Sequence, residues 1–470
     1  MNIILKNASY LFVSNILIRF LSAISSILVA RYLGPINYGV LSIGLAFSSI
    51  AGYFTDLGLS HTFIREASKD YKKDLSKLVS SHFKIKVIFA VLTSITIYFI
   101  VELFYGNKNI REVIYLMTFP TIFGSVLQGV GASYFQAIQQ MKYTAYIRSF
   151  SGLITVISLI IGIILKLPLN IIAPFYGFSS LIGGIYSLYL LSKRISIIKG
   201  WDNAILTDLL SFSAGGLFLT LLPQIPPIIL EKVTTLREVG AFSAAYRIPA
   251  VLYQFPGVIA SAFYPLLFNY GSLKKFYEHT LLSINEAKLM TTLGGCMVIP
   301  FILYSEWWVK LIFGSEWTNI ASLLSILSLI LFLQSINYPL ADSLTTRGYQ
   351  SRRSVITFIS LLIAIILYYI LGSSYGALGG AFSAIIIEIT LLVGLIIFND
   401  KSKQILLKGV LRQTLLLVAL LIGALKIRNQ LHPLLGSMIF IFFYLIFIII
   451  SDREVLKLCK EYLKVKNKKN

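Results

Sequence analysis

A single arginine lies inside the first long apolar run of the chain, which extends from about residue 8 to residue 30. On a helix, Arg19 shares one face with Asn15, Ser22 and Ser26, at i−4, i+3 and i+7. An arginine in the middle of a membrane helix costs about 2.5–3.5 kcal/mol, so we expect it to face protein or water. The polar stripe therefore predicts a wall that binds an anion. The alternative is an arginine that snorkels or caps backbone carbonyls.

A second arginine has a comparable setting later in the chain. Arg247 lies about a turn and a half into the apolar run 240–267, with Ser243 and Gln254 on its helical face. This pattern predicts a second substrate-binding position, formed by Arg247 and Gln254. The alternative is an arginine at the membrane interface.

Three prolines interrupt the apolar run 209–230. Pro223, Pro226 and Pro227 each remove a backbone hydrogen bond and kink a helix. Broken helices beside a polar cavity recur in transporters, so these prolines predict a hinge. Prolines in an otherwise inert membrane helix are the alternative.

Two acidic residues are candidates for coupling to an ion gradient. Glu388 stands near the middle of the run 376–398, where it either titrates during Na⁺ or H⁺ coupling or belongs to a satisfied structural pair. Asp56 ends the second run, and we interpret it as a partner of Arg65 or a turn cap, with ion coupling as the alternative. Asp342 is expected to be solvated at the end of a run.

The chain has none of the sequence motifs expected of an enzyme. Its two cysteines and four histidines lie apart, without metal-ligand spacing. It also has no phosphate-binding glycine loop and no nucleophile elbow. We therefore predict no catalytic residue, no metal and no other cofactor, apart from coupling to a Na⁺ or H⁺ gradient.

The apolar runs that carry these residues predict an all-α polytopic membrane protein. The 470 residues are 57% hydrophobic, and the runs do not alternate as strands of a membrane barrel do. We expect about fourteen transmembrane helices, with twelve as the alternative. The expected spans are 8–30, 39–60, 84–104, 113–136, 149–165, 171–191, 209–230, 240–267, 289–312, 318–341, 355–371, 376–398, 410–425 and 434–450.

The basic residues predict how the chain is oriented. With the N-terminus inside, 30 of the 41 Lys and Arg fall on the inner side and 8 on the outer side. Cytoplasmic loops carry such an excess, so both termini are expected in the cytoplasm, and the net charge of +21 does not indicate nucleic-acid binding. The longest inner loop, 60–86, predicts an amphipathic basic helix that either lies on anionic headgroups or recruits substrate.

An internal repeat suggests a division into lobes. The stretch 39–46 resembles 240–247, at an offset of 201 residues, and each stretch opens an even-numbered span. An offset of six spans relates two lobes by a pseudo-two-fold axis along the membrane normal. The predicted parts are an N-terminal lobe with helices 1–6 (1–200), a C-terminal lobe with helices 7–12 (201–400), and two additional helices with a basic tail (401–470).

Several short motifs resemble those of a known transporter family. They occur in the order found in that family and are specific as a set. They are ARYLGP (30–35) with Tyr38-Gly39, DLGL (56–59) with Arg65-Glu66, residues 136–142, GAFSAAYR (240–247) and FGSE (313–316). On these motifs the chain resembles the O-antigen and teichuronic-acid type of polysaccharide-biosynthesis flippase, within the multidrug/oligosaccharidyl-lipid/polysaccharide exporter superfamily.

The resemblance implies a fold and a function. Members have two six-helix lobes that form a V around a cationic cavity. They move polyprenyl-diphosphate-linked oligosaccharides from the cytoplasmic to the outer leaflet by alternating access, for surface polysaccharides such as the lipopolysaccharide O-antigen. The expected location is the inner (plasma) membrane, and the expected partners are this substrate, membrane lipids and polysaccharide assembly proteins, without nucleic acid.

The resemblance also bears on the arginines. Related lipid II flippases use cavity arginines on their first and eighth helices, and Arg19 and Arg247 match these positions. Further arginines of those relatives are replaced here by Ser25 and Gly52, so a sparse clamp is expected rather than a dense cluster. Arginine suits a diphosphate because its guanidinium binds phosphate through two parallel hydrogen bonds and stays charged.

Three other functions are weighed against this one. A multidrug cation antiporter of the same superfamily would favour acidic residues in the N-terminal lobe, and the first span has none. A membrane glycosyltransferase or polysaccharide polymerase would be expected to have a large outer loop or an acidic first outer loop, and this chain has neither. A scaffold that transports nothing would leave Arg19 unexplained.

Overall fold

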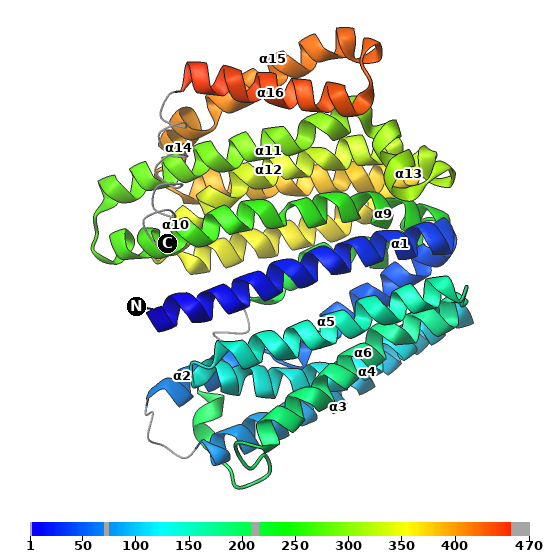
Figure 1. Ribbon diagram of the computed structural model, residues 1–470, viewed down its shortest axis with the longest axis vertical. Helices are drawn as coiled ribbons and strands as arrows, with labels where there is room; N and C mark the ends of the chain where they lie inside the picture. Colours follow the sequence, from blue (N-terminus) through cyan, green and yellow to red (C-terminus); the bar gives the residue numbers. More distant parts are fainter. Residues whose placement is uncertain (1, 70–74, 208–215, 453–470) are drawn as a thin grey trace. The chain divides into compact units, whose positions relative to one another are not determined.

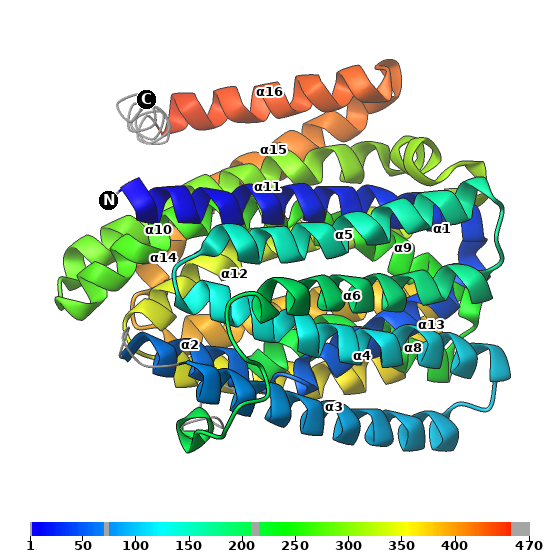
Figure 2. The ribbon, with the colours of Figure 1, turned by 60° about the horizontal axis from the view of Figure 1, so that its bottom comes forward.

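The computed structural model describes residues 2–69, 75–207 and 216–452, with the side chains of residues 2–17 and of Arg19 outside the description. These residues form helices and no strand, which confirms the predicted all-α class (Figures 1 and 2). The α-helices are α1 (Asn2–Phe54), α2 (Leu59–Lys69), α3 (Ser76–Phe104), α4 (Lys108–Ala137), α5 (Met141–Ile164), α6 (Leu169–Ser192), α8 (Ile225–Val233), α9 (Leu236–Leu252), α10 (Gln254–Ser272), α11 (Phe276–Phe313), α12 (Ala321–Thr346), α13 (Gln350–Phe398), α14 (Ser402–Gly409), α15 (Leu411–Ile427) and α16 (Pro433–Ser451). Short 3₁₀ helices are η1 (Asn203–Leu206), η2 (Leu222–Gln224), η3 (Ser315–Ile320) and η4 (Arg428–Gln430).

The chain packs into two compact units. Unit 1 comprises Met1–Ser243 and unit 2 comprises Ala244–Asn470, so the boundary falls inside α9. The predicted division at residues 200 and 400, and the two-fold relation between lobes, stay predictions.

Eleven helices of the described residues are long and apolar enough to cross a membrane, or twelve if the bent pair α14–α15 is one span. Two of them, α1 and α13, are 53 and 49 residues long. A membrane crossing needs only about 20 residues, so each of these helices has the length for two crossings. The total of fourteen spans stays a prediction.

Helix α1 folds back on itself at Gly34. The backbone there has φ 69° and ψ 174°, which lies outside the helical region and is readily adopted only by glycine. The hydroxyls of Ser26 and Tyr38 lie 3.2 Å apart. In a straight helix these residues would be about 18 Å apart along the axis, so the two halves must run antiparallel.

Helix α13 breaks in a similar way at Gly376, where φ is 59° and ψ is −135°. A Cβ atom on Gly379 would collide with the carbonyl oxygen of Leu371, so the chain on the two sides of the break is in close contact. A straight helix would separate these two residues by about 12 Å along its axis. The segments 355–371 and 376–398, which the sequence predicts as separate spans, are therefore the two halves of α13.

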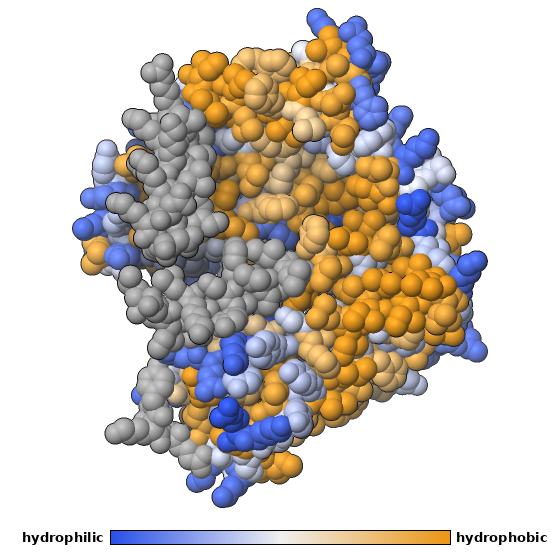
Figure 3. All heavy atoms as spheres, in the orientation of Figure 1, coloured by the Kyte–Doolittle hydropathy of each residue, from blue (hydrophilic) through white to orange (hydrophobic). Residues whose placement is uncertain are grey.

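The helices present apolar surfaces to their surroundings. On α3, exposed apolar side chains recur every three or four residues and form one continuous apolar stripe along the helix. It consists of Ile88, Leu92, Ile95, Phe99 and Leu103. Figure 3 shows apolar residues along the visible helices and hydrophilic residues gathered at helix ends. Soluble proteins rarely expose apolar patches of this extent, so this is a multi-pass membrane protein.

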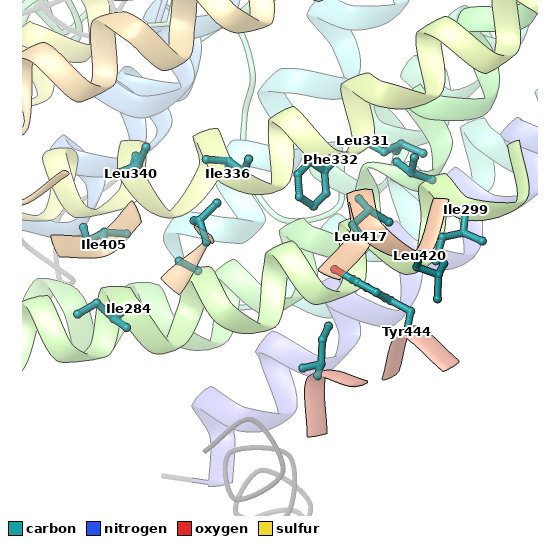
Figure 4. Close-up of a cluster of buried hydrophobic side chains, with 14 of the residues drawn as sticks. Ile284, Ile299, Leu331, Phe332, Ile336, Leu340, Ile405, Leu417, Leu420 and Tyr444 are labelled. Atoms are coloured by element: carbon teal, nitrogen blue, oxygen red, sulfur yellow. The ribbon is translucent and has the colours of Figure 1, made fainter. Parts of the chain in front are cut away.

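In unit 2, the last two membrane helices are anchored on α11. Leu417 and Leu420 of α15 and Tyr444 of α16 are buried in one apolar cluster with residues of α11 and α12 (Figure 4). Tyr444 approaches α11 at Gly295, where any Cβ atom would meet its ring, and its hydroxyl donates to the carbonyl of Gln413 at 3.2 Å. Helices α15 and α16 are thus integral to the packing of unit 2.

In unit 1, the inner loop predicted between residues 60 and 86 is mostly packed against the protein. Leu78 and Val79 are buried in a cluster with Phe63 and Phe135, and they belong to the start of α3. The apolar side of the predicted amphipathic helix therefore packs against the protein, and a role on anionic headgroups or in substrate recruitment stays a prediction. Amphipathic periodicity identifies an apolar helical face, but it does not distinguish a lipid surface from a protein core.

Candidate functional site

The stripe predicted around Arg19 lies on the first half of α1. Arg19 and Asn15 have side chains outside the described set, so their predicted role stays a prediction. Ser22 is half-buried, while Ser26 is buried and bonded to Tyr38. The Ser26 hydroxyl therefore already has a partner within unit 1.

Arg247 lies in α9 between apolar neighbours of unit 2. Its side chain is half-buried, and its Nε atom is shielded from solvent without a hydrogen-bond partner among the described residues. Ala245 and Ile248 beside it are buried. An unsatisfied donor of a charged group is costly in an apolar setting, so this guanidinium can gain free energy by binding an anion.

Gln254, predicted to share the face of Arg247, begins α10 and is half-buried. Its side-chain Nε2 donates to the carbonyl of Ala250 at 3.2 Å. Because Tyr253 donates its backbone N–H to the carbonyl of Pro249 at 2.9 Å, the helical path continues from α9 into α10. Arg247 and Gln254 therefore stand on one continuous helical stretch, as the sequence predicts.

The two repeated stretches meet within unit 1. A Cβ atom on Gly240 would collide with the carbonyl oxygen of Pro35, and one on Gly39 would collide with that of Leu236. The hydroxyl of Ser243 donates to that of Ser42 at 3.0 Å. Each of these contacts is reciprocal at the predicted offset of 201 residues, as at a local two-fold axis. Small residues at this crossing let the two helices approach closely.

The prolines of the seventh span coincide with a break in the helix. The segment Gly216–Val233 passes from α-helix into the 3₁₀ turn η2 and then into α8. Pro223 lies in η2 and is exposed, whereas Pro226 and Pro227 open α8 and are buried. The break is present where the sequence predicts it, and a hinge motion stays a prediction.

Glu388 is buried in unit 2 beside the side-chain amides of Gln334 and Asn337. Its Oε1 accepts a hydrogen bond from Gln334 at 2.8 Å, and its Oε2 accepts one from Asn337 at 2.9 Å. Tyr246 and Tyr368 lie close enough to interact electrostatically with it. Both carboxylate oxygens therefore have donors, which matches the structural alternative and leaves ion coupling untested.

Asp56 follows α1 and bonds within unit 1. Its Oδ1 lies 2.5 Å from Nζ of Lys86 and accepts a hydrogen bond from Ser60 at 2.5 Å. The expected partner Arg65 instead pairs with Glu66 at 2.8 Å, so that part of the prediction was wrong. Arg65 of α2 also donates to the carbonyl of Thr207 at 2.9 Å, while α3 brings Lys86 to the Asp56 carboxylate from 30 residues further along the chain.

The pair of carboxyl groups formed by Glu286 and Asp342 was not predicted from the sequence. Asp342 is buried, not solvated as predicted, and it faces Glu286 of α11. Glu286 lies between the predicted spans 240–267 and 289–312, so the sequence predicts it in an inner loop. Helix α11 begins at Phe276, well before its apolar part. The mixed polar sequence between residues 276 and 288 was the available indication that the helix extends beyond the apolar run.

Comparison with known proteins adds the family. A family model described as "Polysaccharide biosynthesis protein" matches residues 4–270. The chain is 23% identical to a putative O-antigen transporter of Shigella flexneri over 76% of this chain and 88% of that protein. It is also 23% identical to the capsular polysaccharide biosynthesis protein CapF of Staphylococcus aureus over 84% of this chain and 99% of that protein.

Solved structures show the same fold. The lipid II flippase MurJ, in an inward closed conformation, superposes with a TM-score of 0.74 at 18% identity and covers 96% of this chain and 100% of its own. An inward-facing multidrug resistance transporter of the MATE family gives a TM-score of 0.68 at 15% identity, over 82% of this chain and 95% of its own. With more than half of the chain matched by the family model, the protein belongs to the polysaccharide biosynthesis protein family.

Proposed function

We propose that the protein is a flippase that moves polyprenyl-diphosphate-linked oligosaccharide from the cytoplasmic to the outer leaflet, for cell-surface polysaccharide biosynthesis. Its family, its O-antigen transporter relative and its flippase fold support this function. The structural observation that carries it is Arg247, a half-buried guanidinium with an unsatisfied donor in an apolar helix. The protein acts as a transporter and performs no chemistry on the glycan.

The charge of the substrate explains why arginine is suitable. A diphosphate crossing the hydrocarbon needs compensating positive charge, and arginine supplies it without losing its proton. In this proposal Arg19 and Arg247 bind the diphosphate during transport, with Asn15, Ser22 and Gln254 available to phosphate or sugar oxygens. The same proposal includes alternating access, in which Pro223, Pro226 and Pro227 act as a hinge.

The cellular setting is also a proposal. We place the protein in the inner (plasma) membrane with both termini in the cytoplasm, because basic residues concentrate in the inner segments. Polysaccharide assembly proteins are the expected partners, and a Na⁺ or H⁺ gradient is the expected energy source. A multidrug cation antiporter would use the same fold, but the unsatisfied donor of Arg247 favours an anionic substrate.

A leaflet-sidedness assay tests the proposal. Full-length protein is reconstituted into vesicles with a fluorescent undecaprenyl-diphosphate-linked oligosaccharide, and accessibility of the glycan on each side is followed. Loss of a charged hydrogen bond is worth about 1.5–3 kcal/mol, so Arg247→Ala should slow transport by about 10- to 150-fold. Arg19→Ala should have a similar effect.

Two further variants separate charge from geometry. Arg247→Lys should recover only part of the rate, because lysine cannot make the paired contact. Arg237→Ala, an exposed position on the same helix, is the matched control and should be normal. Normal transport by the Arg19 and Arg247 alanine variants at normal expression would remove the anion-binding site from the proposal.

A further inference from the structure

Two carboxyl groups lie against each other inside unit 2. Glu286 of α11 is 0% exposed and Asp342 of α12 is 3% exposed, and their side chains are close enough to share a hydrogen bond. Yet neither oxygen of Glu286, nor Oδ2 of Asp342, receives a hydrogen from any donor in the described part of the chain. Ionised carboxylates are acceptors only, so the contact becomes a hydrogen bond only when a proton is added.

The positive charge nearby is insufficient for two carboxylates. Arg353 of α13 places Nη1 3.7 Å from Oδ1 of Asp342, and the same atom donates to the hydroxyl of Thr345 at 3.2 Å. Burial of two touching negative charges against one such cation is unfavourable. Such carboxyl pairs generally retain one proton between them.

The other cations around α11 are engaged elsewhere. Lys288 lies about 200° around the helix from Glu286, and it pairs with Asp452, which also lies 3.4 Å from Arg412 of α15. Near the start of α11, Arg347 donates to His279 at 3.2 Å and to Thr280 at 2.8 Å. None of these contacts reaches the Glu286 carboxyl group.

We propose that Glu286 and Asp342 hold one exchangeable proton and that this site couples glycolipid flipping to the proton gradient. The coupling rests on the proposed function, whereas the bound proton does not. A proton fits better than a metal ion, since the described residues contain no group of three or more acidic, histidine or cysteine side chains that could hold one. The only bond made or broken is one carboxyl O–H bond.

Tyrosine side chains lie around this pair in the interior of unit 2. Tyr253 interacts electrostatically with Asp342, Arg353 and Glu388, and its ring lies 5.3 Å from that of Tyr338. Tyr264 of α10 also faces Asp342 and Arg353. Tyr253 therefore lies within electrostatic range of both Asp342 and the amide-bound Glu388 of α13.

A second set of polar groups lies between the acid pair and the C-terminal end of α12. The hydroxyl of Thr346 donates to the backbone carbonyl of Asp342 at 2.7 Å and lies 2.7 Å from Nε2 of His279. Polar groups therefore lie on both sides of the acid pair along α12. When the proton leaves, two carboxylates on α11 and α12 face one guanidinium, and their repulsion favours a different packing of these helices.

Infrared spectroscopy of the purified full-length protein tests the bound proton. A protonated carboxyl group gives a carbonyl band that shifts in D₂O. At neutral pH the wild type should show one such band that is lost in both Glu286→Gln and Asp342→Asn. Each amide can donate the hydrogen that the proton supplies, so both variants should fold. Glu306→Gln, at an exposed position on α11, should keep the band. Identical spectra for the wild type and the two pair variants would overturn the proton site.

The vesicle assay with the fluorescent undecaprenyl-diphosphate-linked oligosaccharide tests coupling. An imposed pH gradient should change the wild-type flipping rate severalfold, and Glu286→Gln should lose this response while still flipping without a gradient. An equal gradient response in the variant, or a wild-type response to Na⁺ alone, would overturn proton coupling at this site. If the wild type shows the infrared band but moves no probe, the proton site stands and the proposed function fails.

Discussion

Replacing Asp56 by asparagine should destabilise unit 1 because it leaves Lys86 as an unpaired buried charge. The Lys86 side chain is 3% exposed, and its Nζ lies 2.5 Å from Oδ1 of Asp56. Lys86 also lies directly over Gly129 of α4, so the ammonium group has little room to move toward water. Removal of one partner of a buried pair costs about 3–5 kcal/mol, and we expect a loss near the lower limit because Asp56 is 28% exposed.

Replacing Lys86 instead of Asp56 should cost less free energy of unfolding. In Lys86→Met the remaining Asp56 carboxylate keeps its hydrogen bond from Ser60 and is partly solvated, so we expect a loss of about 1 kcal/mol. The double variant should resemble Lys86→Met alone, since no buried ammonium remains. The two changes would then show a favourable coupling of about 2–3 kcal/mol.

Reversible unfolding of the full-length protein in mixed detergent micelles measures these free energies. Glu112→Gln is the control, because it removes an exposed pair in which Lys108 is 3.8 Å away, and its effect should stay below about 1 kcal/mol. An Asp56→Asn variant as stable as the wild type would refute the buried-pair reasoning. So would additive effects in the double variant.

Three further substitutions test the backbone breaks, the helix crossing and the buried glutamate, each in the same unfolding assay. Gly34→Ala should cost about 1–2 kcal/mol because of its positive φ, whereas Gly52→Ala, which is helical and equally free of neighbours, should be neutral or stabilising; equal effects would contradict the argument. Gly240→Ala forces its helix away from Pro35 and should cost about 1–3 kcal/mol, so unchanged stability would argue against the close crossing. Glu388→Leu leaves two amide donors without acceptors and should cost about 2–4 kcal/mol, more than Glu388→Gln; the reverse order would contradict the amide contacts.

Properties that depend on neighbouring residues along one helix were predictable from the sequence. Apolar runs of this length have no stable setting other than a membrane, so the all-α class followed directly. The break at Pro223 was predictable because proline lacks a backbone donor wherever it occurs. The repeat at residues 39 and 240 was also visible, since both copies need glycine at the same place in a helix crossing.

Contacts between distant segments were decided by the tertiary structure. Asp56 has several basic residues within reach along the chain, and only the packing of α3 selects Lys86. Asp342 looked like a solvated end of a run, but α11 extends beyond its apolar part and buries it against Glu286. Helical periodicity shows which residues share a face, whereas the partner of that face depends on how helices far apart in the sequence pack together.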